Sequence, residues 1–227
     1  MREKIYTIPV NEAFEKQDGC PFCTLYSKLE DTEIDLITGA SMMEPDIRIK
    51  TNQLGFCRKH FDIMLKSGKK LPVALTIQSH LDSLKKEVTP GGLFAKDDPA
   101  KPIKRIEKLN SDCYVCQRID RHFSAMFETA CILFEGEQEF RDKFTSQPFF
   151  CLPHYARLLE SSKKVNSKKR HSELVKAAGE IVEGYLNSLY DDVSLFCKKF
   201  DYNSKDIPWG NSKDSSERAV NFLKSVE

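Results

Sequence analysis

Six of the eight cysteines and two of the five histidines lie in four short motifs that can bind a metal ion. Two motifs read Cys-x-x-Cys and two read Cys-x-x-His, and the two kinds alternate along the chain. Cysteine thiolates and histidine nitrogens are the usual ligands of tetrahedral Zn²⁺, at about 2.3 and 2.0 Å. Taken in chain order, the motifs predict two Cys3His zinc sites: Cys20, Cys23, Cys57 and His60, and then Cys113, Cys116, Cys151 and His154.

The two predicted sites have nearly the same internal spacing. Their half-motifs are separated by 33 residues (24–56) in the first set and by 34 residues (117–150) in the second. The offset between the sets is 93 residues for Cys-x-x-Cys and 94 for Cys-x-x-His. A pair of charged residues, Glu44 and Arg48, also shifts by 93 residues onto Glu137 and Arg141. This spacing indicates an internal duplication.

The ligand sets favour structural metal ions over catalytic ones. Four protein ligands leave no open position for water or substrate, which a catalytic zinc needs. Iron stays an alternative, because thiolate-rich sites also hold iron or iron–sulfur clusters, although a histidine in place of a fourth cysteine disfavours a cluster. We therefore expect two Zn²⁺ per chain and no catalytic residue.

Apolar residues recur at helical spacing through most of the chain, which predicts a mostly α fold. Each metal ligand pair then lies at a helix N-terminus, where the helix dipole favours a thiolate over a thiol. One short segment, residues 5–10, is expected to be extended. The expected helices cover residues 20–39, 57–68, 72–88, 113–135, 137–144, 151–161 and 174–200, followed by a short helix through Ala219, Phe222 and Leu223.

The sequence predicts two tandem, related helical units, with long helices packed between or across them. Residues 89–102 are rich in proline and glycine and read as a linker. We therefore expect a first zinc-helical repeat over residues 1–98 and a second over residues 99–227, the second including the long helix and a C-terminal tail. Whether the two repeats pack as one domain stays open.

Charge and composition restrict the partners and the compartment. The chain has 35 Lys and Arg against 34 Asp and Glu, so it offers no general attraction to nucleic acid or to an anionic membrane. No stretch approaches the ~18 consecutive apolar residues of a membrane span, and residues 1–10 do not resemble a secretory signal. We expect a cytoplasmic protein, in which cysteines serve metal or redox chemistry rather than disulfides.

Four stretches around the ligands carry a family resemblance: Cys20-Pro21-Phe22-Cys23, residues 43–52, Gly55-Phe56-Cys57-x-x-His60, and Phe150-Cys151-Leu152-Pro153-His154. With them the chain resembles a family of uncharacterised clostridial proteins catalogued as domain of unknown function 6062. The resemblance covers most of the chain and implies a bacterial cytosolic protein of this length. It implies no activity, because none is established for the family.

Other candidate features have simpler structural explanations. The Cys20–Cys23 motif alone looks like a glutaredoxin redox motif, but the βαβ pattern of that fold is missing. The Glu44–Arg48 pair and its counterpart are typical of i, i+4 helix support. A basic cluster, Lys163, Lys164, Lys168, Lys169 and Arg170, is interpreted as a solvated loop. His80, His122 and His171 are expected on a helix surface or in the core, and Cys131 and Cys197, which lie within apolar stripes, are expected in the core.

The leading hypothesis for function is a non-enzymatic protein-interaction or scaffold module stabilised by zinc. A closed metal site fixes the geometry of a helical surface without offering chemistry, which suits a protein partner. A redox-responsive thiol or zinc protein is one alternative, and a nucleic-acid-binding regulator is another. The sequence does not indicate a particular partner or an oligomeric state.

Overall fold

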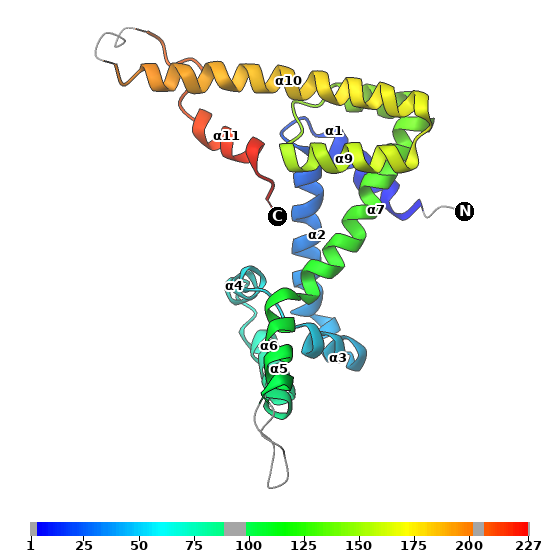
Figure 1. Cartoon of the computed structure of the whole chain (residues 1–227), viewed down its shortest axis with the longest axis vertical. Coiled ribbons are helices and arrows are strands. Elements are labelled where there is room, and N and C mark those ends of the chain that lie inside the picture. Colours follow the sequence, from blue (N-terminus) through cyan, green and yellow to red (C-terminus); the bar gives the residue numbers. More distant parts are fainter. Residues whose placement is uncertain (1–3, 89–98, 202–206, 227) are drawn as a thin grey trace. The chain divides into compact units, whose positions relative to one another are not determined.

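The computed structural model describes residues 4–88, 99–201 and 207–226 (Figure 1). Over these ranges the chain forms helices and no strand, which confirms the predicted mostly α fold. The elements are η1 (Lys4–Tyr6), α1 (Thr7–Glu15), α2 (Pro21–Ile37), η2 (Ala40–Met43), α3 (Pro45–Leu54), α4 (Arg58–Lys66), α5 (Lys70–Val88), α6 (Ala100–Ser111), α7 (Tyr114–Gly136), α8 (Gln138–Thr145), α9 (Leu152–Val165), α10 (Lys168–Lys198) and α11 (Ser215–Leu223).

The chain divides into two compact units that are interleaved in sequence. Unit 1 consists of Met1–Ser27 and Phe123–Glu227, and unit 2 consists of Lys28–His122. The boundaries fall inside α2 and α7, so each of these two helices supplies residues to both units. This division does not follow the predicted boundary between residues 98 and 99. Of the predicted linker, residues 89–98 lie outside the described residues, and Ala100–Pro102 belong to α6.

Unit 1 is built around a cluster of phenylalanine rings. The rings of Phe22 and Phe127 stack with their centroids 3.9 Å apart, and Phe14 contacts Phe140 at 4.8 Å. Around this cluster, α10 packs on α9, and α11 packs on both (Figure 1). Burial of such large apolar side chains is the main favourable contribution to packing. The fully buried phenylalanine rings of unit 1 are Phe14, Phe22, Phe123, Phe127, Phe140, Phe144 and Phe150, and Phe222 of α11.

The segment expected to be extended, residues 5–10, is helical instead. It forms η1 and the first part of α1. Val10, Ala13 and Phe14 are all buried, and their i, i+3, i+4 spacing places them on one helix face. Pro9 is tolerated because it lies in the first turn, where its missing N–H has no intrahelical partner. Packing of this face against α8 therefore decides the conformation.

Unit 2 is centred on α5, which packs against α3, α4 and α6. Between α3 and α4 the chain turns at Gly55, which has φ +64°. A side chain there would be strained and would meet Leu109 Cδ2 at 3.0 Å and the His80 ring at 3.4 Å. Gly55 thus lets the chain leave α3 and enter α4 while the two neighbouring side chains stay close.

The eight helices expected from the apolar pattern are all present, with ends that differ by a few residues. Besides α1, the sequence analysis did not identify α3 and α6. Only Thr51 is buried in α3, and no residue of α6 is buried. The short α3 has no wide apolar stripe, which is the signal that sequence periodicity detects. In contrast, α6 does carry Ile103, Ile106 and Leu109 at helical spacing, but the proline-rich stretch that contains its start was interpreted as a linker.

We expect Phe140→Ala to lower the free energy of unfolding by about 3–5 kcal/mol, because it removes a fully buried ring from the contact between α8 and α1. Urea unfolding followed by circular dichroism measures the loss. The control is Tyr190→Ala in α10, whose side chain is 71% exposed and whose replacement should change stability by less than about 0.5 kcal/mol. Equal losses in the two variants would contradict the assignment of the core.

Candidate metal centres

All four cysteine motifs begin a helix. Cys57 and Cys151 are the N-cap residues of α4 and α9, and Cys20 and Cys113 directly precede α2 and α7. In each motif the carbonyl of the first cysteine accepts a hydrogen bond from the N–H four residues later, at 2.8–3.3 Å. The second ligand therefore lies one helical turn from the first and on the same side. This confirms the expected placement of the motifs at helix N-termini.

The motifs combine differently from the prediction. The first Cys-x-x-Cys meets the second Cys-x-x-His, and the second Cys-x-x-Cys meets the first Cys-x-x-His. In each combination the four ligand atoms lie within 4.8 Å of one another. The predicted sets within each repeat are therefore wrong as groupings, although the eight residues are the same. The Cys20 group consists of Cys20, Cys23, Cys151 and His154, and the Cys57 group consists of Cys57, His60, Cys113 and Cys116.

The lengths of α2 and α7 explain why each Cys-x-x-Cys motif meets the Cys-x-x-His motif of the other predicted set. The 17 residues of α2 span about 25 Å at 1.5 Å per residue, and the 23 residues of α7 span about 34 Å. Each helix carries the chain from one unit into the other, so Cys57 belongs to unit 2 while Cys20 belongs to unit 1. Spacing alone cannot distinguish the two pairings, because both Cys-x-x-His motifs offer the same ligands.

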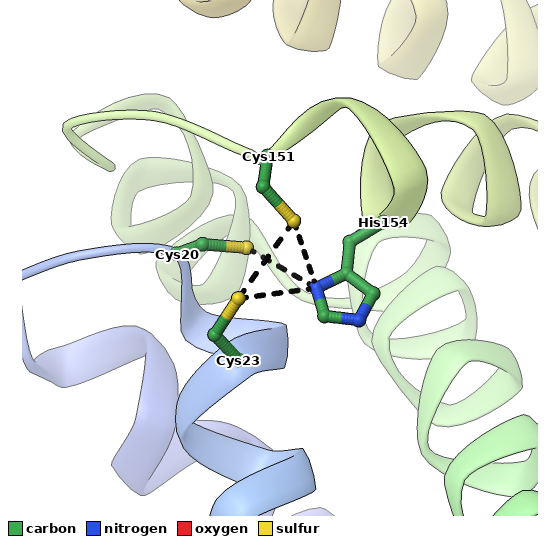
Figure 2. A group of neighbouring side chains, drawn as sticks. All are labelled: Cys20, Cys23, Cys151 and His154. Carbon is green, nitrogen blue, oxygen red and sulfur yellow. Dashed lines mark hydrogen bonds between the residues drawn. The ribbon is translucent and has the colours of Figure 1, made fainter. Parts of the chain in front are cut away.

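In the Cys20 group the four side chains point toward a common centre (Figure 2). His154 Nδ1 lies 3.1 Å from Cys151 Sγ, 3.4 Å from Cys23 Sγ and 3.6 Å from Cys20 Sγ, and Cys23 Sγ lies 3.7 Å from Cys151 Sγ. A zinc tetrahedron with these ligand types has S···S edges of about 3.8 Å and S···N edges of about 3.5 Å. The donor atoms therefore already have the spacing that such an ion requires.

Aromatic rings surround the Cys20 group. The His154 ring lies 5.2 Å from the ring of Phe123, 5.9 Å from Phe127 and 6.0 Å from Phe22, measured between centroids. His154 is only 1% exposed, and Cys151 is fully buried. The group is thus part of the phenylalanine core of unit 1.

The Cys57 group has the same donors in a similar arrangement. His60 Nδ1 lies 3.1 Å from Cys57 Sγ, 3.3 Å from Cys113 Sγ and 3.4 Å from Cys116 Sγ. Cys57 Sγ and Cys116 Sγ are 3.9 Å apart. A backbone hydrogen bond from Tyr114 N–H to the Gly55 carbonyl, at 3.0 Å, holds the start of α7 beside the chain that leads into α4.

A carboxylate supports the histidine of the Cys57 group. His60 Nε2 lies 3.1 Å from Glu30 Oε1, while Nδ1 faces the sulfurs. Lys59 Nζ lies 2.9 Å from the same carboxylate oxygen. A carboxylate that accepts a hydrogen bond from a metal-binding imidazole fixes its tautomer and orientation. Sequence analysis missed Glu30, because its position within α2 carries no signal of this long-range contact.

The sulfur atoms of each group influence one another's ionisation. Burial opposes ionisation of Cys20, but hydrogen bonds with Cys151 and Cys23 lower the pKa of its thiol well below the ordinary value. Hydrogen bonds with Cys20 and Cys23, together with burial, raise the pKa of Cys151. In the Cys57 group, burial is the main cause that raises the pKa of both Cys113 and Cys116. Three thiolates this close therefore need a cation to be ionised together.

The histidines and cysteines outside the two groups take different positions. His80 is buried, and burial followed by the charge of Arg105 lowers its pKa. His171 Nδ1 lies 3.0 Å from Ser162 Oγ, and His122 Nε2 lies 4.0 Å from the buried carboxylate of Glu33. Cys131 is buried as predicted, and burial raises the pKa of its thiol to about 12. Cys197 is exposed, so its prediction as a core cysteine is wrong.

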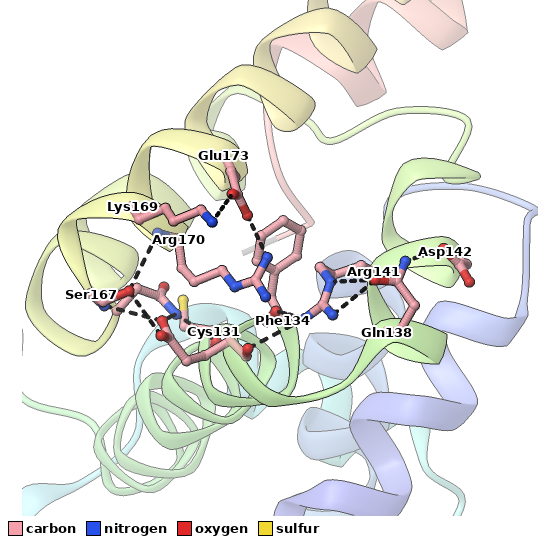
Figure 3. Close-up of polar contacts among 11 residues, drawn as sticks. Cys131, Phe134, Gln138, Arg141, Asp142, Ser167, Lys169, Arg170 and Glu173 are labelled. Carbon is pink, nitrogen blue, oxygen red and sulfur yellow. Dashed lines mark hydrogen bonds and ion pairs between the residues drawn. The ribbon is translucent and has the colours of Figure 1, made fainter.

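The paired Glu and Arg residues have parallel local roles. Glu44 is the N-cap residue of α3, and Glu137 is the N-cap residue of α8. The Arg48 guanidinium donates to the carbonyl of Met42, and that of Arg141 donates to the carbonyl of Glu135, six residues earlier in both cases. Arg141 also donates to the Phe134 carbonyl at 2.8 Å (Figure 3). The arginines thus bind the chain that leads into each helix, which fits a structural role.

The basic cluster lies in the last turn of α9 and the first turn of α10, so its prediction as a loop is wrong, and it includes charges that are already paired. Arg170 lies 2.5 Å from the Glu173 carboxylate, and Lys169 lies 4.0 Å from it (Figure 3). Ser167 caps α10 by accepting a hydrogen bond from the N–H of Arg170, and it donates to Glu135 at 2.8 Å. These contacts favour a structural turn over a phosphate-binding site.

Comparisons with known proteins identify one family. The model described as "Family of unknown function (DUF6062)" matches residues 1–227, the whole chain. No curated protein and no solved structure matches the chain. In the parts of the chain that the structure describes, no helix combines the length and apolar character needed to cross a membrane.

We expect Cys57→Ser to expose the buried thiol of Cys113 to alkylation and to speed the alkylation of Cys116, which is already exposed, while the alkylation of Cys20 and Cys23 is unchanged. The reason is that Cys57 shares its group with Cys113 and Cys116. Peptide mapping of alkylated cysteines measures the effect. The matched variant is Cys151→Ser, which should expose Cys20 and Cys23 instead. If Cys57→Ser instead exposed Cys20 and Cys23, the result would contradict the observed grouping and support the predicted set of Cys20, Cys23, Cys57 and His60.

We expect Glu30→Gln to weaken metal binding at the Cys57 group by about 10–100-fold, because it removes the carboxylate charge from His60 Nε2. Competition with a chelator, with the bound metal counted, measures this affinity. The control is Asp35→Asn on the same helix, whose carboxylate pairs with Lys69 at 2.7 Å and touches no ligand. An equal effect of both variants would show that only general charge matters.

Proposed function

The chain belongs to the DUF6062 family, whose function is unknown, and we propose that it is a cytoplasmic, non-enzymatic protein-interaction or scaffold module stabilised by two Zn²⁺ ions. The observation that carries the proposal is the convergence of six cysteines and two histidines into two groups of four ligands. Three sulfurs and one nitrogen are a common ligand set of structural zinc.

Zinc is the ion that fits these ligands best. Nitrogen and sulfur ligands in a tetrahedral arrangement favour zinc, whereas oxygen-rich octahedral sites favour magnesium, calcium or manganese. Iron bound by the same ligands is the alternative, and elemental analysis of the purified protein distinguishes iron from zinc. A four-coordinate ion of this kind would link α2 to α9 in unit 1 and α4 to α7 in unit 2.

The proposed ions have a structural rather than a catalytic role. Both groups supply four ligands, so neither keeps a coordination position for a substrate or an activated water. The binding free energy of such an ion contributes directly to folding. Unit 2 in particular gains from this, because several of its helices bury few residues.

A protein partner is supported by an exposed apolar strip on α5. Apolar residues recur there at intervals of three and four, and they line a shallow hollow of about 660 Å³. Leu81, near its middle, is 53% exposed. Helix faces with this pattern bind other helices in many protein assemblies. The strip consists of Ala74, Ile77, Leu81, Leu84 and Val88.

We expect the purified protein to contain two zinc ions per chain and to lose helical structure when a strong chelator removes them, because binding free energy at such sites is folding free energy. Elemental analysis gives the stoichiometry, and far-ultraviolet circular dichroism follows the helices. Readdition of zinc to the chelated protein is the control for irreversible damage. Unchanged ellipticity after complete metal removal would contradict the proposal.

The same preparation tests the two alternative functions. A regulator that binds nucleic acid would be retained on DNA or RNA with a steep salt dependence. A protein that works by thiol–disulfide exchange would be isolated without metal and with disulfides between Cys20 and Cys23 or between Cys113 and Cys116.

A further inference from the structure

The two ligand groups have the same donors but differ in their access to solvent. The comparison is clearest between Cys23 and Cys116, which are the second cysteines of the two Cys-x-x-Cys motifs. Cys23 is partly buried, whereas Cys116 is exposed. The cysteines of the two Cys-x-x-His motifs also differ in exposure. Cys151 of the Cys20 group is buried, whereas Cys57 of the Cys57 group is only partly buried.

The surroundings of the two groups explain this difference. The Cys20 group is packed among phenylalanine rings, and Phe22, Phe123 and Phe127 are all fully buried. Cys20 and Cys151 are buried, so a reagent can reach their sulfurs only when part of the core of unit 1 opens, and Cys23 is partly covered. The free energy needed to open the core therefore slows the reaction of these sulfurs with a reagent in solution.

One side of the Cys57 group, with Cys57 and Cys116, lies at the surface of unit 2, while His60 and Cys113 are buried. The residues that follow its ligands, Arg58, Lys59 and Gln117, are all exposed. His60 is buried, and its second nitrogen lies 3.1 Å from the Glu30 carboxylate, which is itself partly exposed. A small reagent therefore has more direct access to Cys116 than to the cysteines of the Cys20 group.

We propose that the Cys57 group is a reactive metal centre, at which soft electrophiles modify Cys116 first and thereby release the metal, while the Cys20 group keeps its ion. This inference rests on the proposed function, because it requires metal in both groups. It assigns them separate roles, in which the Cys20 group holds the fold and the Cys57 group responds to thiol-reactive compounds.

The chemical step needs no oxidant. With a maleimide as the electrophile, the Cys116 sulfur donates an electron pair to an alkene carbon and forms a C–S bond. The C=C π bond breaks, and the neighbouring carbon takes a proton from water. The sulfur becomes a neutral thioether, so the ion loses one of its three anionic ligands and its binding weakens.

The two cysteines outside the ligand groups, Cys197 and Cys131, must not be confused with Cys116 when the labelled sites are mapped. Cys197 is exposed and belongs to neither group, so it will react whatever the metal does. The test therefore uses the variant Cys197→Ser. Cys131 serves as an internal control, because its thiol is buried in unit 1 and should stay unlabelled in the folded protein.

The experiment treats the zinc-loaded Cys197→Ser protein with limiting N-ethylmaleimide and maps the labelled cysteines over time, while a zinc dye records release. We expect Cys116 to react at least about tenfold faster than Cys20, Cys23 or Cys151, with release of one zinc ion per chain. Equal rates in the two groups, or faster reaction of the Cys20 group, would overturn the inference.

Metal exchange gives a second measurement that requires no chemical modification. The intact protein is incubated with isotopically enriched zinc and examined by native mass spectrometry. We expect one bound ion to exchange quickly and the other slowly. The slow ion should be the one that remains in Cys57→Ser, and exchange of both at one rate would contradict the inference. A preparation with no zinc before treatment would refute the proposed function instead, so the two failures are distinguishable.

Discussion

The close approach of three sulfurs to one imidazole nitrogen, in each of two places, is the constraint on which the rest of the structure depends. Ligand atoms within 4.8 Å of one another can be ionised together only if a cation balances their charge. Each group lies at two helix N-termini, whose dipoles contribute positive potential in the same direction. An ion at these points would hold the start of each helix in place, and the packing of each unit follows from that.

The pairing of the motifs closes two nested loops rather than two successive ones. Cys23 and Cys151 are 128 residues apart in sequence, and Cys57 and Cys116, which lie between them, are 59 apart. The entropic cost of closing a loop grows only slowly with its length, so the long outer loop destabilises the fold only slightly more than the short inner loop. The nesting explains why unit 1 is made from both ends of the chain and unit 2 from its middle.

The two groups have the same residue types, three cysteines and one histidine, but lie in different environments. In unit 1 the histidine is packed among phenylalanine rings, which exclude water and raise the cost of any opening. In unit 2 the histidine is oriented by Glu30, and the sulfur of Cys116 lies at the surface. Identical donors therefore differ in accessibility because of what surrounds them, and this difference is the basis for separate roles.

The sequence by itself determined the eight candidate ligands that the structure brings together, the helical class and most helices, because residue type, motif spacing and apolar periodicity are local properties. It failed at α1, where burial of Phe14 decides the conformation, at α3, which has no wide apolar stripe, and at α6, whose first residues were interpreted as part of a linker. Only the tertiary structure decided which motifs combine, since both Cys-x-x-His motifs are chemically equivalent and α2 and α7 carry the chain between units. The contact of Glu30 with His60 was likewise decided by folding, because it joins helices that no local pattern relates.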